Sequence, residues 1–283
     1  MRPLTLTTWI LALVLPGCGL VMGSASARLA NNVSTAILSQ NDIETVRDGA
    51  PAYLIMLDGL IAGDPESPAL LLAGAQLYGA YGTAFVEEPA RRRRLTERSL
   101  AYGRRALCAE TKPVCKTVDG PYEPFAAAVA KTGSSDVAAL YGFGSAWAGW
   151  IEAHSEDWAA VAEIPKVETL MQRVVTLDDA YDDGGAHLYL GVLSNLRPAA
   201  LGGKPEEGKY HFERAIEISD GRNLMAKVLY ARYYARNVFD RSLHDRLLTE
   251  VVEADPEAPG LTLSNTIAQT QARQLLDESN DYF

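Results

Sequence analysis

Helix-forming segments with short interruptions fill nearly the whole chain beyond Val33, and this pattern limits the possible folds more than any other feature. Many segments begin with Pro in the first turn or with an Asp or Ser cap, and many end at Gly or Asp-Pro, as helix boundaries prefer. Ala and Leu dominate, and long β-branched runs are absent. We therefore predict an all-α protein whose short connections make neighbouring helices antiparallel. The predicted helices span residues 33–47, 50–61, 68–85, 89–108, 122–131, 135–154, 157–164, 165–177, 185–196, 205–218, 223–237, 241–253 and 261–280.

Two similar junctions indicate that helix pairs repeat. Residues 60–68 and 252–259 each end one helix at Asp-Pro and begin the next after Glu-x-Pro, and residues 211–219 have the aromatic and small residues of a tetratricopeptide second helix. Stacked pairs bury apolar faces that a single pair leaves exposed. We predict degenerate tetratricopeptide-like antiparallel pairs, stacked into a compact superhelix.

The N-terminus has the features of a bacterial secretory signal. An apolar run, Leu4–Leu15, follows Arg2 and ends in Leu-Pro-Gly-Cys, which resembles a lipobox. Cleavage before Cys18 would leave a lipidated cysteine, and the run is too short to span a membrane. The alternative is a plain signal peptide that is cut after Ala25 or Ala27.

We divide the chain into a signal peptide (1–17), a lipidated N-terminus and flexible tether (18–32) and one helical domain (33–283). We expect a lipid-anchored protein on the periplasmic side of the envelope, and Gly19 after the cysteine favours the outer membrane. The formal charge of −10 argues against nucleic-acid binding.

Cys108 and Cys115 flank a Lys-Pro bend and form an even pair, so a disulfide is expected; two reduced cysteines are the alternative.

Two helices combine glycines with aromatic side chains. Gly within a helix costs about 1 kcal/mol relative to Ala, so close packing or a cavity is expected beside them. An apolar ligand pocket or pore lining is the functional interpretation, with tyrosine hydroxyls to orient a polar group; ordinary core is the alternative. The candidate lining residues are Tyr78, Tyr81, Tyr141, Phe143, Trp147 and Trp150.

Four consecutive arginines follow Pro89-Ala90, and a solvated helix face with nearby glutamates is their default interpretation. Arg91 and Arg94 are the pair expected to point the same way, as a contact for a carboxylate or a partner. The four histidines lack metal-ligand spacing, and neither a nucleophile elbow nor a phosphate loop is present. We expect no metal, no cofactor and no catalysis.

The ordered set of motifs resembles the TRAP transporter T-component (TatT) family of periplasmic lipoproteins. The segments that carry the resemblance are 49–60, 136–141 with Trp147 and Trp150, 164–171, 182–191 with His187, 201–204 leading into 211–215, and 268–276. The resemblance implies a non-enzymatic accessory component of tripartite uptake, a homotrimer with a pore through each subunit. It also implies a solute-binding protein as partner and a small organic or apolar ligand.

Two other functions stay open beside this one. A tetratricopeptide-like lipoprotein scaffold would bind envelope proteins in an open concave groove and would have no enclosed pore. An enzyme would need a cleft in which two titratable groups converge.

Overall fold

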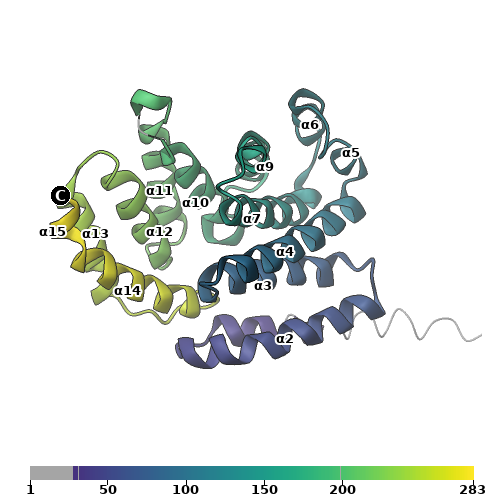
Figure 1. Cartoon of the computed structure of the whole chain (residues 1–283), viewed down its shortest axis with the longest axis horizontal. Coiled ribbons are helices and arrows are strands. Elements are labelled where there is room, and N and C mark those ends of the chain that lie inside the picture. Colours follow the sequence, from purple (N-terminus) through teal and green to yellow (C-terminus); the bar gives the residue numbers. More distant parts are fainter. Residues whose placement is uncertain (1–27, 31, 198) are drawn as a thin grey trace, which may run out of the picture.

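The computed structural model describes residues 28–30, 32–197 and 199–283 (Figure 1). These residues form helices and connecting loops without a strand, which confirms the predicted all-α class. The predicted signal peptide and Cys18 lie outside the described residues. The tetratricopeptide-like character of the helix pairs stays a prediction.

The first half of the chain forms the lower and right parts of the molecule in Figure 1. A short helical segment before residue 39 precedes the labelled elements. These are α2 (Ile43–Gly63), α3 (Pro68–Phe85), α4 (Pro89–Glu110), α5 (Lys112–Cys115), α6 (Tyr122–Val129), η1 (Ser134–Asp136), α7 (Val137–Ala153) and α8 (Trp158–Val161).

The second half continues the arc towards the C-terminus. Its elements are α9 (Ile164–Leu177), α10 (Tyr181–Asn195), η2 (Ala199–Leu201), α11 (Pro205–Ile218), α12 (Leu224–Leu229), the π-helix η3 (Tyr230–Ala235), α13 (Arg241–Glu253), α14 (Thr262–Asp277) and α15 (Ser279–Tyr282).

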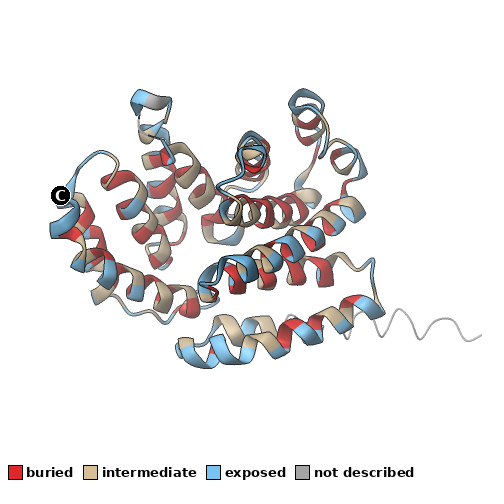
Figure 2. Cartoon of the chain, viewed as in Figure 1, coloured by how far each residue is buried: buried red, intermediate tan, exposed pale blue. Residues whose placement is uncertain are grey.

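Helices that follow each other in the sequence pack against each other, most closely α3 with α4 and α10 with α11. Three apolar clusters fill the interior. One joins α2, α3 and α4, the second joins α4 to α10, and the third joins α11 to α14. The arc also meets itself, because α14 contacts α2 (Figure 1). Figure 2 shows buried residues along the inward faces of the helices and exposed residues along much of α2.

The contact between α10 and α11 depends on two glycines. A Cβ atom at Gly191 would lie 2.7 Å from the Phe212 ring, and one at Gly208 would lie 1.8 Å from the Asn195 amide nitrogen. Neither site has room for a larger residue, so the two glycines allow the close approach of α10 and α11.

The predicted helix boundaries hold for residues 68–85, 205–218 and 241–253, whereas the break predicted near Asp48 is wrong. One helix, α2, runs through Pro51, although proline removes an internal hydrogen bond and usually ends or bends a helix. Residues 28–30 are helical and Ala30 is buried, so the folded body begins before the predicted end of the tether at Asn32.

A second difference concerns residues 223–237, which were expected to form one α-helix. The α-helical part ends at Leu229 and a π-helical segment follows. The Tyr230 hydroxyl donates to Glu213 at 3.0 Å, and the Tyr234 hydroxyl donates to Glu206 at 3.1 Å. These contacts with α11 depend on three-dimensional packing, which the hydrophobic period of the sequence does not report.

None of the helices in the described part of the chain has the length and apolar character needed to cross a membrane.

Candidate functional site

Tyr78 is the first of the predicted lining residues, and its hydroxyl holds α3 to α2. It donates to Asp58 at 2.7 Å, and Tyr102 of α4 donates to the other carboxylate oxygen at 2.6 Å. Arg98 completes the group through an ion pair of 3.1 Å with Asp58. Burial, and next the hydrogen bond to Asp58, raises the pKa of Tyr78. The Asp58 carboxylate of α2 is therefore the group that joins α2, α3 and α4.

Tyr81 has a comparable contact one turn further along α3. Its hydroxyl donates to the backbone carbonyl of Arg47 at 3.2 Å. Arg47 lies four residues before Pro51, so its carbonyl is the acceptor that a helical N–H would otherwise occupy. Tyr81 therefore satisfies a carbonyl that Pro51 leaves without a helical donor.

Phe143 and Trp147 lie in the apolar cluster around α7, where both are almost fully buried. Trp147 meets the Phe125 ring edge-on at 6.2 Å, and the buried Lys166 ammonium lies 5.8 Å from the Trp147 ring centroid. The Val118 carbonyl accepts a hydrogen bond of 2.9 Å from that ammonium. Trp150 is only partly buried and stacks on His154 with ring centroids 4.6 Å apart.

Tyr141 lies within a group of tyrosines contributed by α7 and α10. Its ring centroid is 5.2 Å from that of Tyr181 and 6.1 Å from that of Tyr189. A Cβ atom at Gly185 would lie 2.3 Å from the Tyr141 hydroxyl, so the glycine makes room for this ring. Burial, and next the charge of Asp182, raises the pKa of Tyr189 to about 12. We call Tyr141, Tyr181 and Tyr189 the tyrosine cluster.

The backbone beside the tyrosine cluster is strained. Asp182, Asp183 and Gly184 follow one another in the left-handed region, with φ values of 53°, 51° and 76°. Left-handed backbone costs a residue with a side chain about 1 kcal/mol, and such strain collects at ligand clamps and similar sites. The regular part of α10 begins only after this turn, as the predicted start at Gly185 requires.

Arg91 and Arg94 are both exposed on α4. The Arg91 guanidinium lies 5.7 Å from the centroid of the Tyr81 ring. The two arginines between them are engaged with backbone carbonyls, Arg92 with Val86 at 2.9 Å and Arg93 with Ala153 at 3.1 Å.

A disulfide joins Cys108 in the last turn of α4 to Cys115 in α5, with Cα atoms 4.9 Å apart.

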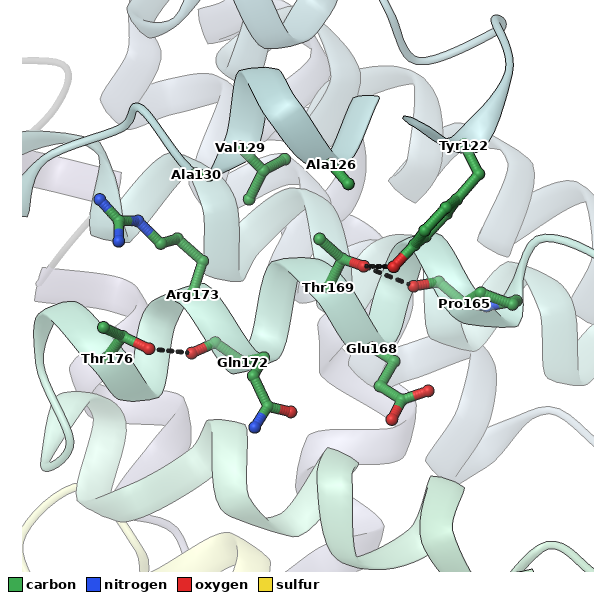
Figure 3. A pocket seen from close by; sticks show the side chains of 10 residues that line it. All are labelled: Tyr122, Ala126, Val129, Ala130, Pro165, Glu168, Thr169, Gln172, Arg173 and Thr176. Carbon is green, nitrogen blue, oxygen red and sulfur yellow. Dashed lines mark hydrogen bonds between the residues drawn. The ribbon is translucent and has the colours of Figure 1, made fainter. Parts of the chain in front are cut away.

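Two open pockets border α9, and neither is lined by the predicted aromatic residues. The first, of about 400 Å³, lies between α6 and α9 (Figure 3) and includes Tyr122, whose hydroxyl is 3.0 Å from that of Thr169. The second, of about 590 Å³, lies between α9 and α11. Glu168 and Gln172 line both, and in Figure 3 they point away from Ala126 and Val129.

We call the second cavity the α9–α11 pocket. The residues that line it are Glu168, Gln172, Lys204, Glu206, Glu207, Tyr210 and His211. Lys204 forms an ion pair with Glu207 at 3.1 Å, and Glu206 accepts the hydrogen bond from Tyr234. Tyr210 is 59% exposed, whereas His211 is 8% exposed and forms the inner wall.

His211 belongs to a chain of four polar side chains. Its Nδ1 atom is 2.8 Å from Nδ1 of the fully buried His187, whose Nε2 atom is 2.7 Å from the Asp179 carboxylate. The other Asp179 oxygen accepts hydrogen bonds from Arg214. Although burial opposes it, hydrogen bonds from His187 and Arg214 lower the pKa of Asp179.

Sequence reasoning overlooked this histidine pair because it examined spacing along the chain. His187 and His211 lie on consecutive helices that pack antiparallel, and both face inward. A comparison of the buried faces of neighbouring helices would have placed them together. In the ranges that the structure describes, no group of three or more His, Cys, Asp and Glu side chains is arranged to hold a metal ion.

Comparison with known proteins identifies the family of the chain, which the geometry of the pockets alone does not. A comparison with curated proteins gives no match. The model of the TRAP transporter T-component family matches residues 39–283, which include every labelled helix from α2 to α15. T components are envelope-associated accessory proteins of TRAP transporters. A match over this much of the chain shows that the protein belongs to the TRAP transporter T-component family.

Proposed function

We propose that this T component binds a small organic or apolar ligand at the tyrosine cluster and passes it to a solute-binding subunit. One observation carries the proposal: a strained turn of three left-handed residues, 182–184, stands beside three packed tyrosines. The fold retains this strain where aromatic rings and hydroxyls meet, and aromatic surface with few polar groups suits an organic ligand.

The contacts of the other predicted lining residues restrict the proposed ligand site to the tyrosine cluster. Phe143 and Trp147 pack against neighbouring core residues, and the hydroxyls of Tyr78 and Tyr81 are engaged with α2. Tyr141 is the predicted lining residue that remains beside the strained turn. We assign the ligand's apolar part to the tyrosine rings and its polar group to their hydroxyls.

Attachment and assembly complete the proposal. A lipid on Cys18 would hold the protein at the periplasmic face of the envelope, in the outer membrane, and a homotrimer is the assembly that the family resemblance implies. The open pockets beside α9 favour the second candidate, a scaffold for envelope proteins, because such grooves suit an extended partner.

Native mass spectrometry of a soluble form that starts at Gly19 tests the proposal. We expect a trimer with bound small molecules, and the adducts should diminish in Tyr141→Phe and Tyr189→Phe. Tyr210→Phe, in the α9–α11 pocket, serves as the matched control and should keep them. A monomer without adducts would instead favour the second candidate function, a scaffold for envelope proteins.

Partnering is measured separately. Biolayer interferometry with the purified solute-binding subunit of the same transporter should give saturable binding at physiological salt. Absence of binding both with and without the transported solute would reject a direct handover.

A further inference from the structure

One helix, α4, is strongly basic although the chain as a whole is acidic. Residues 89–105 contain seven arginines and one glutamate, whereas the full sequence has 26 basic and 36 acidic residues. Four exposed arginines of α4 share one face of the helix, and we call them the arginine row. They are Arg91, Arg94, Arg98 and Arg105. We propose that the arginine row docks the protein onto the headgroups of an anionic phospholipid bilayer. This docking rests on the proposed lipid at Cys18 and adds which face of the protein meets the membrane.

The spacing of the row places its members on one side of α4. They follow one another at intervals of three, four and seven residues, which keeps them within about 60° of each other around an α-helix. From Arg91 to Arg105 the row extends for roughly 21 Å along the helix axis. Glu97, the one acid between Pro89 and Arg105, lies on another side of the helix, with its carboxylate 3.5 Å from Nε2 of His154. The row is therefore a continuous basic edge.

Buried tyrosine rings order three members of the row. The guanidinium groups of Arg91, Arg98 and Arg105 each lie over a tyrosine ring, at 5.4–5.7 Å from its centroid. The three rings belong to Tyr81, Tyr78 and Tyr102, none of which is more than 7% exposed. A guanidinium that stacks on a ring can still donate from its edge to a phosphate oxygen. The fold thus limits the motion of these side chains before an anion arrives, which reduces the entropy lost on binding.

Two members of the row lack an acidic partner. In the ranges that the structure describes, no carboxylate lies within ion-pair distance of Arg91 or Arg94, whereas Arg98 pairs with Asp58. The Glu88 carboxylate accepts from two backbone N–H groups of the first turn instead. Arg91 lies in that turn, where the helix dipole disfavours a cation, and like charges three or four positions apart repel each other. Such a conflict with local stability is expected at functional positions, and an anionic surface would relieve it.

The point at which the N-terminal segment joins the folded body lies close to the row. The carbonyl of the buried Ala30 accepts a hydrogen bond of 2.6 Å from Tyr53 of α2. Tyr53 and Asp58, the carboxylate that pairs with the row, are separated by about 7.5 Å along the α2 axis. Residues 19–27 separate Cys18 from the described part of the chain, and a segment of this length spans at most about 30 Å. A lipid on Cys18 would therefore keep the row within reach of the bilayer surface.

This tether favours a bilayer over a free anion or an acidic protein as the partner of the row. A surface to which the chain is already attached has a high effective concentration, so a few charges are sufficient for docking. Ile55, three residues before Asp58 on α2, is 72% exposed and adds apolar surface beside the row, as interfacial proteins combine basic and apolar side chains. Because the rest of the chain is acidic, docking through the row would also fix the orientation of the protein.

Energy transfer between α4 and a vesicle tests the docking. A hexahistidine tag before Gly19 attaches the chain to vesicles that contain a nickel-chelating lipid, so the test does not depend on lipidation of Cys18. The donor is a fluorophore on Ala101→Cys, an exposed position between Arg98 and Arg105, and the acceptor is a labelled lipid. We expect more transfer with about 30% phosphatidylglycerol than with phosphatidylcholine alone, and the difference should disappear in about 1 M NaCl, where charges are screened within about 3 Å.

Charge-matched variants make the measurement specific. One arginine near an anionic bilayer changes the docking equilibrium about fivefold, so Arg91→Gln combined with Arg94→Gln should weaken docking roughly 25-fold. Lys131→Gln combined with Arg246→Gln removes the same charge from exposed positions outside α4 and should leave the transfer unchanged.

Three results would overturn the docking. They are equal transfer on both lipid compositions, equal effects of the two double variants, and loss of binding to the solute-binding subunit in the α4 variant without a lipid effect. The last result would assign the row to an acidic protein instead. The mass of the mature N-terminal peptide tests the lipid on Cys18 separately, so failure of the anchor and failure of the row are distinguishable.

Discussion

The hydroxyl of Tyr81 on α3 donates to the one carbonyl of α2 that Pro51 deprives of its helical donor, the carbonyl of Arg47. A hydrogen bond missing from one helix is thereby replaced by a side chain of the next. This relationship explains why an aromatic residue that the sequence assigned to a ligand has a structural contact, and it allows a direct test.

Tyr81→Phe should lower the free energy of unfolding by about 1 kcal/mol, because it removes one hydrogen bond and leaves the Arg47 carbonyl unpaired. In a Pro51→Ala background the restored N–H can occupy that carbonyl, so the same change should cost much less. Urea denaturation of the wild type, both single variants and the double variant measures this coupling. Equal costs in both backgrounds would refute this replacement.

Asp58→Ala should be more destabilising, by roughly 2–4 kcal/mol, because two tyrosine hydroxyls and Arg98 lose their common partner. Asp277→Ala, at an exposed position of α14, is the control and should change stability little. Thermal unfolding followed by circular dichroism measures both. A similar melting temperature for the two variants would show that the Asp58 group contributes little.

Two glycine substitutions should have opposite effects. Gly208→Ala places a Cβ atom on the Asn195 amide and near the Gly191 carbonyl, so it should destabilise the fold by about 1–3 kcal/mol. Gly59→Ala lies within α2 with open space around the new atom, and the better helix propensity of Ala should stabilise by about 0.5–1 kcal/mol. Chemical denaturation of the pair provides the measurement, and destabilisation by Gly59→Ala would indicate that another surface covers α2.

Acid should weaken the fold in two successive stages. His211 takes up its proton near pH 4 in the folded chain and near 6.5 when unfolded, so stability falls as the pH drops from about 6.5 to 4. Asp179, whose pKa is lowered by its partners, adds a loss only as the pH falls through and below its usual value of 3.8. His211→Gln should flatten the first stage in urea titrations at stepped pH, and an unchanged slope would contradict this assignment.

The helical class and most helix positions could be predicted from the sequence, because the hydrophobic period, the capping residues and the helix breakers are local properties. The sequence did not predict that a helix continues through Pro51, since the compensating hydroxyl comes from Tyr81, thirty-four positions away from Arg47. The same reason applies to the site. Its aromatic residues predicted a ligand lining that includes Tyr141, but only the packing of α10 on α11 brings His187 to His211.

The contact between α14 and α2 distinguishes this molecule from a linear array of repeats. In a linear array each unit depends on its nearest neighbours, and the ends fray independently. Here the last long helix, α14, also contacts α2, so each of these helices has a neighbour that a linear array would not provide. Loosening of one end therefore removes contacts from the other, which couples the stability of the two ends of the folded body.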